Sequence, residues 1–343
     1  MKIYTIRDIA QLSGVSVTTV SRVLNHRPEV NEDTRQRVEK VMADCGFVGN
    51  ANARGLKQTE RNEVYIILRG HQNTFLNQLV ERIHSYAADH DALYITVYID
   101  ESADEFRTAF RLCQERRPSA IVFVGSAVDK RAEVFREVEI PSIFVTVDTS
   151  GTLMKHASSV SIDDRSMGYA VMRYLLEAGH RRIAVLGGSR KGSDVFARRF
   201  RGCMDACGEF GLAFDPTWFL TTRFSMTDAM RAIETLYTRH PEMTALFCMS
   251  DTLAIGAIRW LTDQGVRVPQ DVSVAGFDGL PVGNYLVPRL TTVEQPVDQL
   301  AEACVRVLTE MMTQGTSARH VTVPARLLVR ESVLPLSNVL RTE

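Results

Sequence analysis

Apolar residues recur at helical spacing in three short stretches at the start of the chain. They are Ile6, Ile9, Ala10 and Leu12; then Val20, Val23 and Leu24; then Val38, Val41, Met42 and Cys45. A period close to 3.6 residues predicts helices that pack through their apolar sides. Residues 1–46 are therefore expected to form a small all-α head.

Polar residues at the borders of these stretches predict where the helices begin and end. Thr5 and Asp8 form a capping-box pair for the first helix, and Ser16 can cap the second. Gly14 supplies the backbone freedom that a sharp turn between them needs. Asn31 is expected to begin the third helix and Gly46 to end it.

The second predicted helix leaves an outer face of short or polar side chains: Val17, Thr18, Ser21, Arg22 and Asn25. Two helices joined by a tight turn, the second with such a face, are typical of a helix-turn-helix, whose second helix enters the DNA major groove. The segment 1–28 is mildly basic, which suits a reader that docks through a few placed contacts. An ordinary two-helix corner is the alternative.

From Val64 onward, short apolar runs alternate with longer helical patterns. Strands are predicted over 64–68, 93–98, 120–125, 142–147, 182–187, 245–249 and 273–277. Helices are predicted over 77–88, 105–116, 166–178, 195–210, 225–237, 252–264 and 297–312. Continuous apolar strands between helices indicate an α/β fold with parallel sheets, and this many units predicts two doubly wound subdomains. Ligands of such sheets bind beyond the carboxyl ends of the strands, here across a cleft.

Composition and charge narrow the class of protein. The chain has 343 residues, a formal net charge of −1 and 45% hydrophobic residues, as expected of a globular protein with two or three domains. It contains no apolar run of about 18 residues, so no membrane span is expected. The N-terminus lacks the apolar core of a signal peptide, so a cytoplasmic location is expected.

Motifs of catalysis and metal binding are not found. The segment 68–73 after the first strand lacks Gly-x-Gly-x-x-Gly, and 187–193 lacks the Gly-Lys-Ser/Thr ending of a phosphate loop. The six cysteines are scattered without a Cys-x-x-Cys pair, which predicts reduced buried thiols, no metal and no cofactor. A non-enzymatic protein is expected. The alternative is a carbohydrate-binding protein or a sugar-processing enzyme with a regulatory head.

A series of short motifs also runs along the chain in a fixed order. The head carries Ile6-Arg7-Asp8-Ile9-Ala10, Ser13-Gly14-Val15-Ser16 and the run 19–25, and the connector carries 50–56. The core carries 179–184, 199–202, 250–257, 268–273, Gly276-Phe277-Asp278 and 288–293. In this order and spacing they resemble the lactose/galactose repressor family of bacterial transcription regulators.

The resemblance implies a DNA-binding regulator, typically a repressor, of carbohydrate metabolism genes, controlled by a small sugar-like effector. It also implies a homodimer on a palindromic double-stranded operator, and a core shaped like a periplasmic binding protein. The implied divisions are a head at 1–46, a hinge and linker at 47–61, a first core subdomain at 62–161 plus 294–323, and a second at 162–290 plus 324–340.

The resemblance assigns roles to residues of the head and connector. Val17, Thr18 and Arg22 would read bases, with Arg22 able to fork onto guanine. Phosphate contacts would come from Thr5, Ser16, Thr19, Ser21, Asn25, Asn31 and Thr34. A hinge helix containing Asn50, Ala53 and Leu56 would enter the minor groove, where Leu56 would wedge into a base step. Gly49 stands where the family usually has a proline.

The effector would bind between the two core subdomains. The matching positions are Arg69, Phe75, Thr146, Asp163, Arg199, Phe224, Ser250, Asp278 and Gln295. Plain core packing is an equal alternative for the two phenylalanines. Thr146 falls where many members carry an aspartate, and Arg69 and His71 add positive charge after the first strand. These departures favour an anionic effector such as a phosphorylated sugar; a neutral sugar is the equal alternative. The sequence leaves open whether the effector releases DNA or promotes binding.

Overall fold

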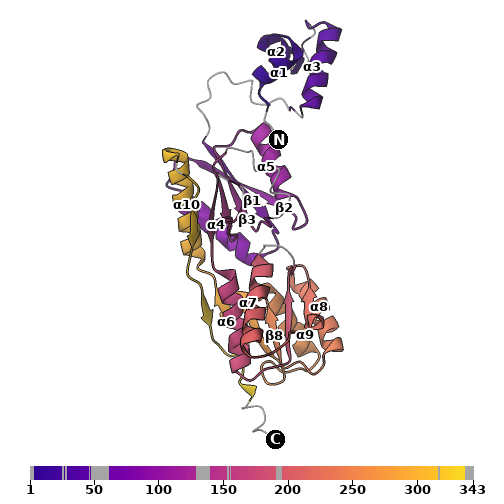
Figure 1. Cartoon of the computed structure of the whole chain (residues 1–343), viewed down its shortest axis with the longest axis vertical. Helices are drawn as coiled ribbons and strands as arrows, with labels where there is room; N and C mark the ends of the chain where they lie inside the picture. The colour runs from indigo at the N-terminus through magenta and orange to yellow at the C-terminus, as the bar shows by residue number, and fades with distance from the viewer. Residues whose placement is uncertain are drawn as a thin grey trace.

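The computed structural model describes residues 4–24, 27, 29–45, 47, 62–128, 140–152, 154, 156–190, 195–315 and 317–336. It contains a helical head and an α/β core built on two sheets (Figure 1). This is the predicted fold class, which is thereby confirmed. Gly46 and the connector 48–61 lie outside the described residues.

The head consists of α1 (Ile6–Ser13), α2 (Val17–Leu24) and α3 (Glu32–Asp44). The predicted capping box is present, since the Thr5 hydroxyl accepts from the Asp8 amide and the Asp8 carboxylate accepts from the Thr5 amide. Gly14 has φ +67°, the left-handed conformation that the turn requires. The caps fix the three helices as the sequence predicts.

One expectation for the head core is wrong. Ile9, Val20 and Val38 are fully buried and join the three helices, but Leu12 is 57% exposed. Ser13 takes the inward position at the end of α1 and donates to the Ile9 carbonyl oxygen at 2.5 Å. That local hydrogen bond satisfies the hydroxyl, so the small polar residue lies inside and the leucine faces outward.

The first core sheet has the strand order β11-β5-β4-β3-β1-β2. Its strands are β1 (Glu63–Arg69), β2 (Leu93–Ile99), β3 (Ala120–Val124), β4 (Ser142–Val145), β5 (Ala157–Ser161) and β11 (His320–Thr322). All of its strand pairs are parallel. On β1, Val64 and Ile66 face α4 (Thr74–Ala87) and α10 (Val297–Gln314), while Tyr65 and Ile67 face α5 (Glu105–Glu115).

The second sheet has the order β12-β10-β9-β8-β6-β7. Its strands are β6 (Ile183–Gly187), β7 (Phe219–Thr221), β8 (Ala245–Cys248), β9 (Ser273–Asp278), β10 (Thr291–Glu294) and β12 (Arg326–Leu328). Only β10 and β12 pair antiparallel. Helices α6 (Asp164–Glu177) and α7 (Val195–Glu209) cover one face, and α8 (Met226–Arg239) and α9 (Asp251–Asp263) cover the other (Figure 1).

The chain passes between the two sheets at three places. It leaves the first sheet after β5, returns from β10 through α10, which packs along α4, and leaves again between β11 and β12 (Figure 1). These passages hold the sheets end to end. The residue limits given above for the head, linker and subdomains stay predictions.

Candidate functional site

A cavity of about 480 Å³ lies where the strand ends of the two sheets face one another. Its first wall contains Arg69 at the end of β1 and Gly125 and Thr146 just after β3 and β4. Its second wall contains Ser250 after β8 and Asp278 at the end of β9. The cavity lies beyond the carboxyl ends of parallel strands, and its volume is typical of small-molecule sites.

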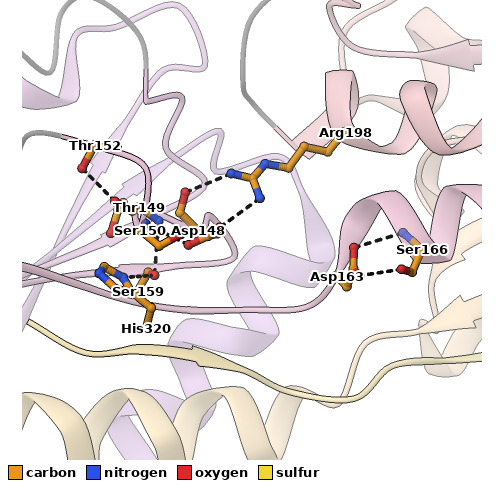
Figure 2. Close-up of polar contacts among 9 residues, drawn as sticks. All are labelled: Asp148, Thr149, Ser150, Thr152, Ser159, Asp163, Ser166, Arg198 and His320. Atoms are coloured by element: carbon orange, nitrogen blue, oxygen red, sulfur yellow. Dashed lines mark hydrogen bonds and ion pairs between the residues drawn. The ribbon is translucent and has the colours of Figure 1, made fainter.

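The structure brings together all but one of the predicted effector residues. Those that line the cavity are Arg69, Phe75, Thr146, Arg199, Phe224, Ser250, Asp278 and Gln295. Asp163 does not line it. Its carboxylate caps α6 by accepting from the Ser166 amide at 3.0 Å and from the Ser166 hydroxyl (Figure 2). Because the cap occupies both carboxylate oxygens, we leave Asp163 out of the effector site.

Arg199 is the cation at the centre of the second wall. It is 4% exposed, and its Nε donates to Asp164 at 2.8 Å while its Nη1 donates to the Met249 carbonyl oxygen at 2.8 Å. Its guanidinium carbon lies 3.5 Å from the centre of the Phe277 ring. Burial raises the pKa of Asp164 to about 6, although Arg199 opposes the shift. The arginine is thus held rigidly and balanced by an acid.

Asp278 presents a carboxylate oxygen to the cavity. Its Oδ1 accepts from Gln295 Nε2 at 2.8 Å, and among the described residues its buried Oδ2 has no hydrogen-bond partner. Asp251 lies behind it, fully buried, and accepts from the Leu280 amide and the Thr292 hydroxyl. Burial raises the pKa of both carboxyls, and repulsion between the two acids adds to the shift on Asp251.

The backbone is strained at two of the lining residues. Thr146 has φ +82° and Asp278 has φ +123°, conformations that residues with a side chain rarely adopt. Both follow or end a central strand and line the cavity. Such strain is commonly found at ligand sites, where the surrounding packing holds it.

The positive charge expected at Arg69 is balanced within the protein. Arg69 Nε lies 3.6 Å from Oε2 of Glu105, which is fully buried at the start of α5. Glu105 is distant in sequence, so the positive charge expected from Arg69 did not include this partner. His71 and Thr146, the other departures that favour an anion, also line the cavity.

The aromatic residues differ in their surroundings. Phe75 is almost fully buried in the core cluster beneath the first sheet, so it serves packing as well as the cavity wall. Phe224 stacks on Phe196 with ring centres 4.5 Å apart, and both rings line the cavity. These two rings provide an apolar surface suited to the faces of a sugar ring.

Two ion pairs that the sequence did not predict span the cleft. Arg223 Nη2 lies 3.2 Å from Asp100, and both residues line the cavity. Arg198 Nη1 lies 3.1 Å from Asp148, and its Nη2 donates to the Asp148 carbonyl oxygen (Figure 2). Each pair joins a residue near the first sheet to one near the second, and nothing in the sequence indicates such long-range partners.

In the head, α2 presents Val17, Thr18 and Arg22 on its exposed side. Ser16 accepts from the Thr19 amide at 3.1 Å, and Asn31 accepts from the Asp33 amide, so both act as caps. Thr34 lies on α3 and Ser21 on α2. Asn25, Asn50, Ala53 and Leu56 lie outside the described residues.

Among the described residues, no cluster of His, Cys, Asp and Glu could hold a metal ion, and every described cysteine is a free thiol. The described helices include none that is long and apolar enough to span a bilayer.

Comparison with known proteins identifies both parts of the chain. Residues 5–50 match the model for bacterial regulatory proteins of the lacI family, and residues 172–333 match a periplasmic binding protein-like domain. The HTH-type transcriptional regulator MalR of Clostridium butyricum is 30% identical over 332 residues, which cover 95% of this chain and 98% of the relative. The regulator GalS of Salmonella typhimurium is 32% identical over 336 residues, 96% of each protein.

Solved structures agree. The complex of the transcriptional regulator CelR with cellobiose has a TM-score of 0.71 at 26% identity and covers 96% of this chain and 99% of that one. The lac repressor dimer bound to operator has a TM-score of 0.70 at 24% identity, covering 97% and 100%, and supports the fold alone. The chain belongs to the lacI family of bacterial regulatory proteins, and it is a DNA-binding transcription regulator.

Proposed function

We propose that this protein is a cytoplasmic homodimeric repressor of carbohydrate metabolism genes, which binds a palindromic operator through its paired heads. A sugar bound in the cavity between the two sheets would change operator affinity. The observation that carries the proposal is one chain that combines a capped helix-turn-helix with a polar cavity at facing strand ends. The proposal gives the cavity a binding role and no catalytic one.

In the head, Val17, Thr18 and Arg22 are proposed to read bases in the major groove. The side chains proposed to bind phosphates are Thr5, Ser16, Thr19, Ser21, Asn25, Asn31 and Thr34. A phosphate oxygen accepts, so a hydroxyl contacts it by donating its one proton. Ser16 and Thr19 share a hydrogen bond, which leaves one of the two hydroxyl protons for a phosphate, whereas the Thr5 hydroxyl donates to Asp8 and would have to turn to reach one. Asn50, Ala53 and Leu56 are proposed to form the minor-groove hinge.

The effector is proposed to be an uncharged sugar. Each lining arginine has an acidic partner: Arg69 has Glu105, Arg199 has Asp164, and Arg223 has Asp100. By contrast, Asp278 Oδ2 is a buried acceptor without a partner among the described residues. A sugar hydroxyl supplies the missing donor without adding charge. One relative is a ribose operon repressor, and one similar solved structure is a complex of CelR with cellobiose; ribose and cellobiose are both neutral sugars.

Control of DNA binding is proposed to be a population shift. An effector that contacts both walls favours one relation of the subdomains over the other, and the paired hinges carry that preference to the heads. The ion pairs Arg198–Asp148 and Arg223–Asp100 join the two sides in the form described here. A change in the relative position of the two sides would alter the distances within these two ion pairs.

The proposal is tested by fluorescence anisotropy of the full-length chain on labelled DNA from upstream of its own gene. Binding should exceed that to a scrambled duplex at moderate ionic strength, and one sugar from a panel of ribose, galactose, maltose and cellobiose should change it. A parallel assay for sugar hydrolysis and phosphorylation addresses the enzyme alternative. Equal affinity for all duplexes, with and without sugars, would contradict the proposal.

A further inference from the structure

Buried polar atoms without partners gather on one wall of the cavity. Among the described residues, Arg69 Nε, Glu105 Oε2 and Ser126 Oγ are all buried and lack hydrogen bonds. Arg69 and Ser126 line the cavity, and Glu105 lies directly behind them. Buried polar atoms in folded proteins are nearly always paired, so this group marks a place that a bound polar molecule completes.

Glu105 does not line the cavity, and its position is fixed by α5 and by the segment that follows β3. It is the first residue of α5, where the positive end of the helix dipole favours a carboxylate. Its Oε1 accepts from the Ala127 amide at 3.1 Å, which ties it to the segment that follows β3. Asp104 caps the same helix turn by accepting from the Phe106 amide at 3.0 Å. The carboxylate therefore has little freedom to move.

The position of Glu105 determines the charge that Arg69 shows to a ligand. The side chain of Arg69 is 16% exposed and that of Glu105 is fully buried, so little solvent screens the pair. At 3.6 Å the carboxylate balances the guanidinium without occupying its Nε hydrogen. Arg69 thus lines the cavity while the pair as a whole remains neutral. An anionic ligand placed against Arg69 would also face this nearby negative charge.

We propose that Glu105, a residue outside the cavity lining, is a positioning residue that makes the effector site select neutral sugars over their anionic derivatives. The inference rests on the proposed effector site. It goes further by assigning charge selectivity to one residue that does not touch the ligand. Replacing Glu105 by a neutral residue should leave Arg69 uncompensated and admit anions.

The test measures anion binding directly and does not require the natural effector. Thermal stabilisation of the full-length chain is titrated with inorganic phosphate, and with ribose against ribose 5-phosphate and glucose against glucose 6-phosphate. The variants are Glu105→Gln and Glu105→Met, both of similar size to glutamate. The matched control is Glu115→Gln, at the other end of α5 and outside the cavity.

Both Glu105 variants should be stabilised by phosphate or a sugar phosphate at a concentration at least tenfold below that needed by the unmodified chain. The Glu115 control should behave like the unmodified chain. Adding Arg69→Gln to Glu105→Gln should abolish the gain, because the uncompensated cation is then removed. A merely structural role for Glu105 would lower stability without changing this preference between neutral and anionic ligands.

Three results would overturn the proposal. They are an unchanged phosphate response in folded Glu105 variants, a gain that persists in the Arg69→Gln double variant, and failure of both variants to fold. Operator binding is measured on the same samples, so that failure of the Glu105 proposal can be distinguished from failure of the proposed function. A variant that binds operator specifically but shows no anion gain would reject the role of Glu105 while leaving the regulator proposal intact.

Discussion

Among the lining residues, Asp278 is the one whose replacement we expect to weaken effector binding most. Asp278 lines the cavity, its Oδ1 accepts from Gln295, and its buried Oδ2 has no hydrogen-bond partner among the described residues. Asp278→Asn keeps the shape but replaces one acceptor by a donor. We expect sugar affinity to fall roughly 10- to 100-fold, because a hydrogen bond to a charged group contributes about 1.5–3 kcal/mol.

The measurement is the sugar concentration that gives a half-maximal change in operator binding. Basal operator affinity should be retained, since the head is untouched. Asp163→Asn is the control, because Asp163 caps α6 and does not line the cavity. Equal loss of sugar response in both variants would contradict the assignment.

The buried acids Asp251 and Asp278 also predict a dependence of stability on pH. Burial and their mutual repulsion raise the pKa of Asp251 to about 8, above its ordinary value of 3.8. The folded state therefore holds a proton that the unfolded chain releases. This contribution to stability is complete below about pH 4 and is lost as the pH rises toward 8.

Asp251→Asn removes this titration. The stability advantage of the unmodified chain over the variant should therefore shrink between pH 5 and pH 8, in thermal melts at constant ionic strength. Comparing the two chains cancels groups that do not interact with Asp251, such as His180, whose pKa burial lowers. The remaining change belongs to Asp251 together with Asp278, because the charge of each affects the titration of the other. A difference that stays constant or grows with pH would refute the raised pKa of Asp251.

At this scale the motifs place most of the site, since eight of the nine effector positions line one cavity. The motifs do not predict the acidic partner that balances the charge of each lining arginine. Glu105 and Asp164 are remote in sequence from Arg69 and Arg199, and only the packing of α5 and α6 brings them close. Asp163 shows the converse, because its carboxylate is occupied by the helix that it caps.

Helix α2 carries the sequence-reading role in the proposed function. Val20 and Val23 are buried against the head core, which fixes the opposite side, with Val17, Thr18 and Arg22, toward solvent. Arg22→Ala should weaken binding to the cognate operator by about 1–3 kcal/mol, the usual contribution of a bidentate contact to guanine. Discrimination against an operator changed at the contacted base should fall by a similar factor.

Anisotropy titrations on cognate and single-base variant operators measure both quantities. Arg37→Ala is the matched control, because Arg37 is an exposed arginine on α3. If both substitutions weaken all duplexes to the same extent, Arg22 contributes only nonspecific charge.

Elements with a strong local signal are those that the sequence predicts well. Thr5, Gly14 and Asn31 act as expected because capping and turn chemistry depend on neighbouring residues alone. Five of the described strands went unpredicted: β5 and β10, which are rich in serine or threonine, and β7, β11 and β12, of three residues each. They are too polar or too brief to show an apolar run, and only their pairing with neighbouring strands defines them.

The number of strand–helix units predicts that the whole core divides into two sheets. It does not predict the order in which the chain passes between them. The edge strand β11 pairs with β5, and β12 pairs with β10, across long separations in sequence. Helix α10 joins the first sheet after the chain has completed most of the second. The order of the central strands needs tertiary contacts, which no local pattern contains.

The surface around η4 (Pro281–Asn284) is the best candidate for the contact between subunits. Tyr285 is 83% exposed, Val287 is 95% exposed, and Val282 is also exposed. Apolar side chains gathered in one exposed segment are typical of a protein–protein contact. A two-fold contact uses the same segment of both subunits. A charge introduced there would therefore lie near the same charge on the second subunit.

Val287→Lys should therefore convert a dimer into a species with the chain mass of 38.4 kDa in sedimentation equilibrium. Operator affinity should fall steeply with it, because one head alone loses the second half-site. Sugar binding should persist, since Val287 does not line the cavity. Met226→Lys, at an exposed apolar residue on α8, is the control and should remain dimeric. A Val287→Lys protein that stays dimeric would place the contact between subunits elsewhere on the core.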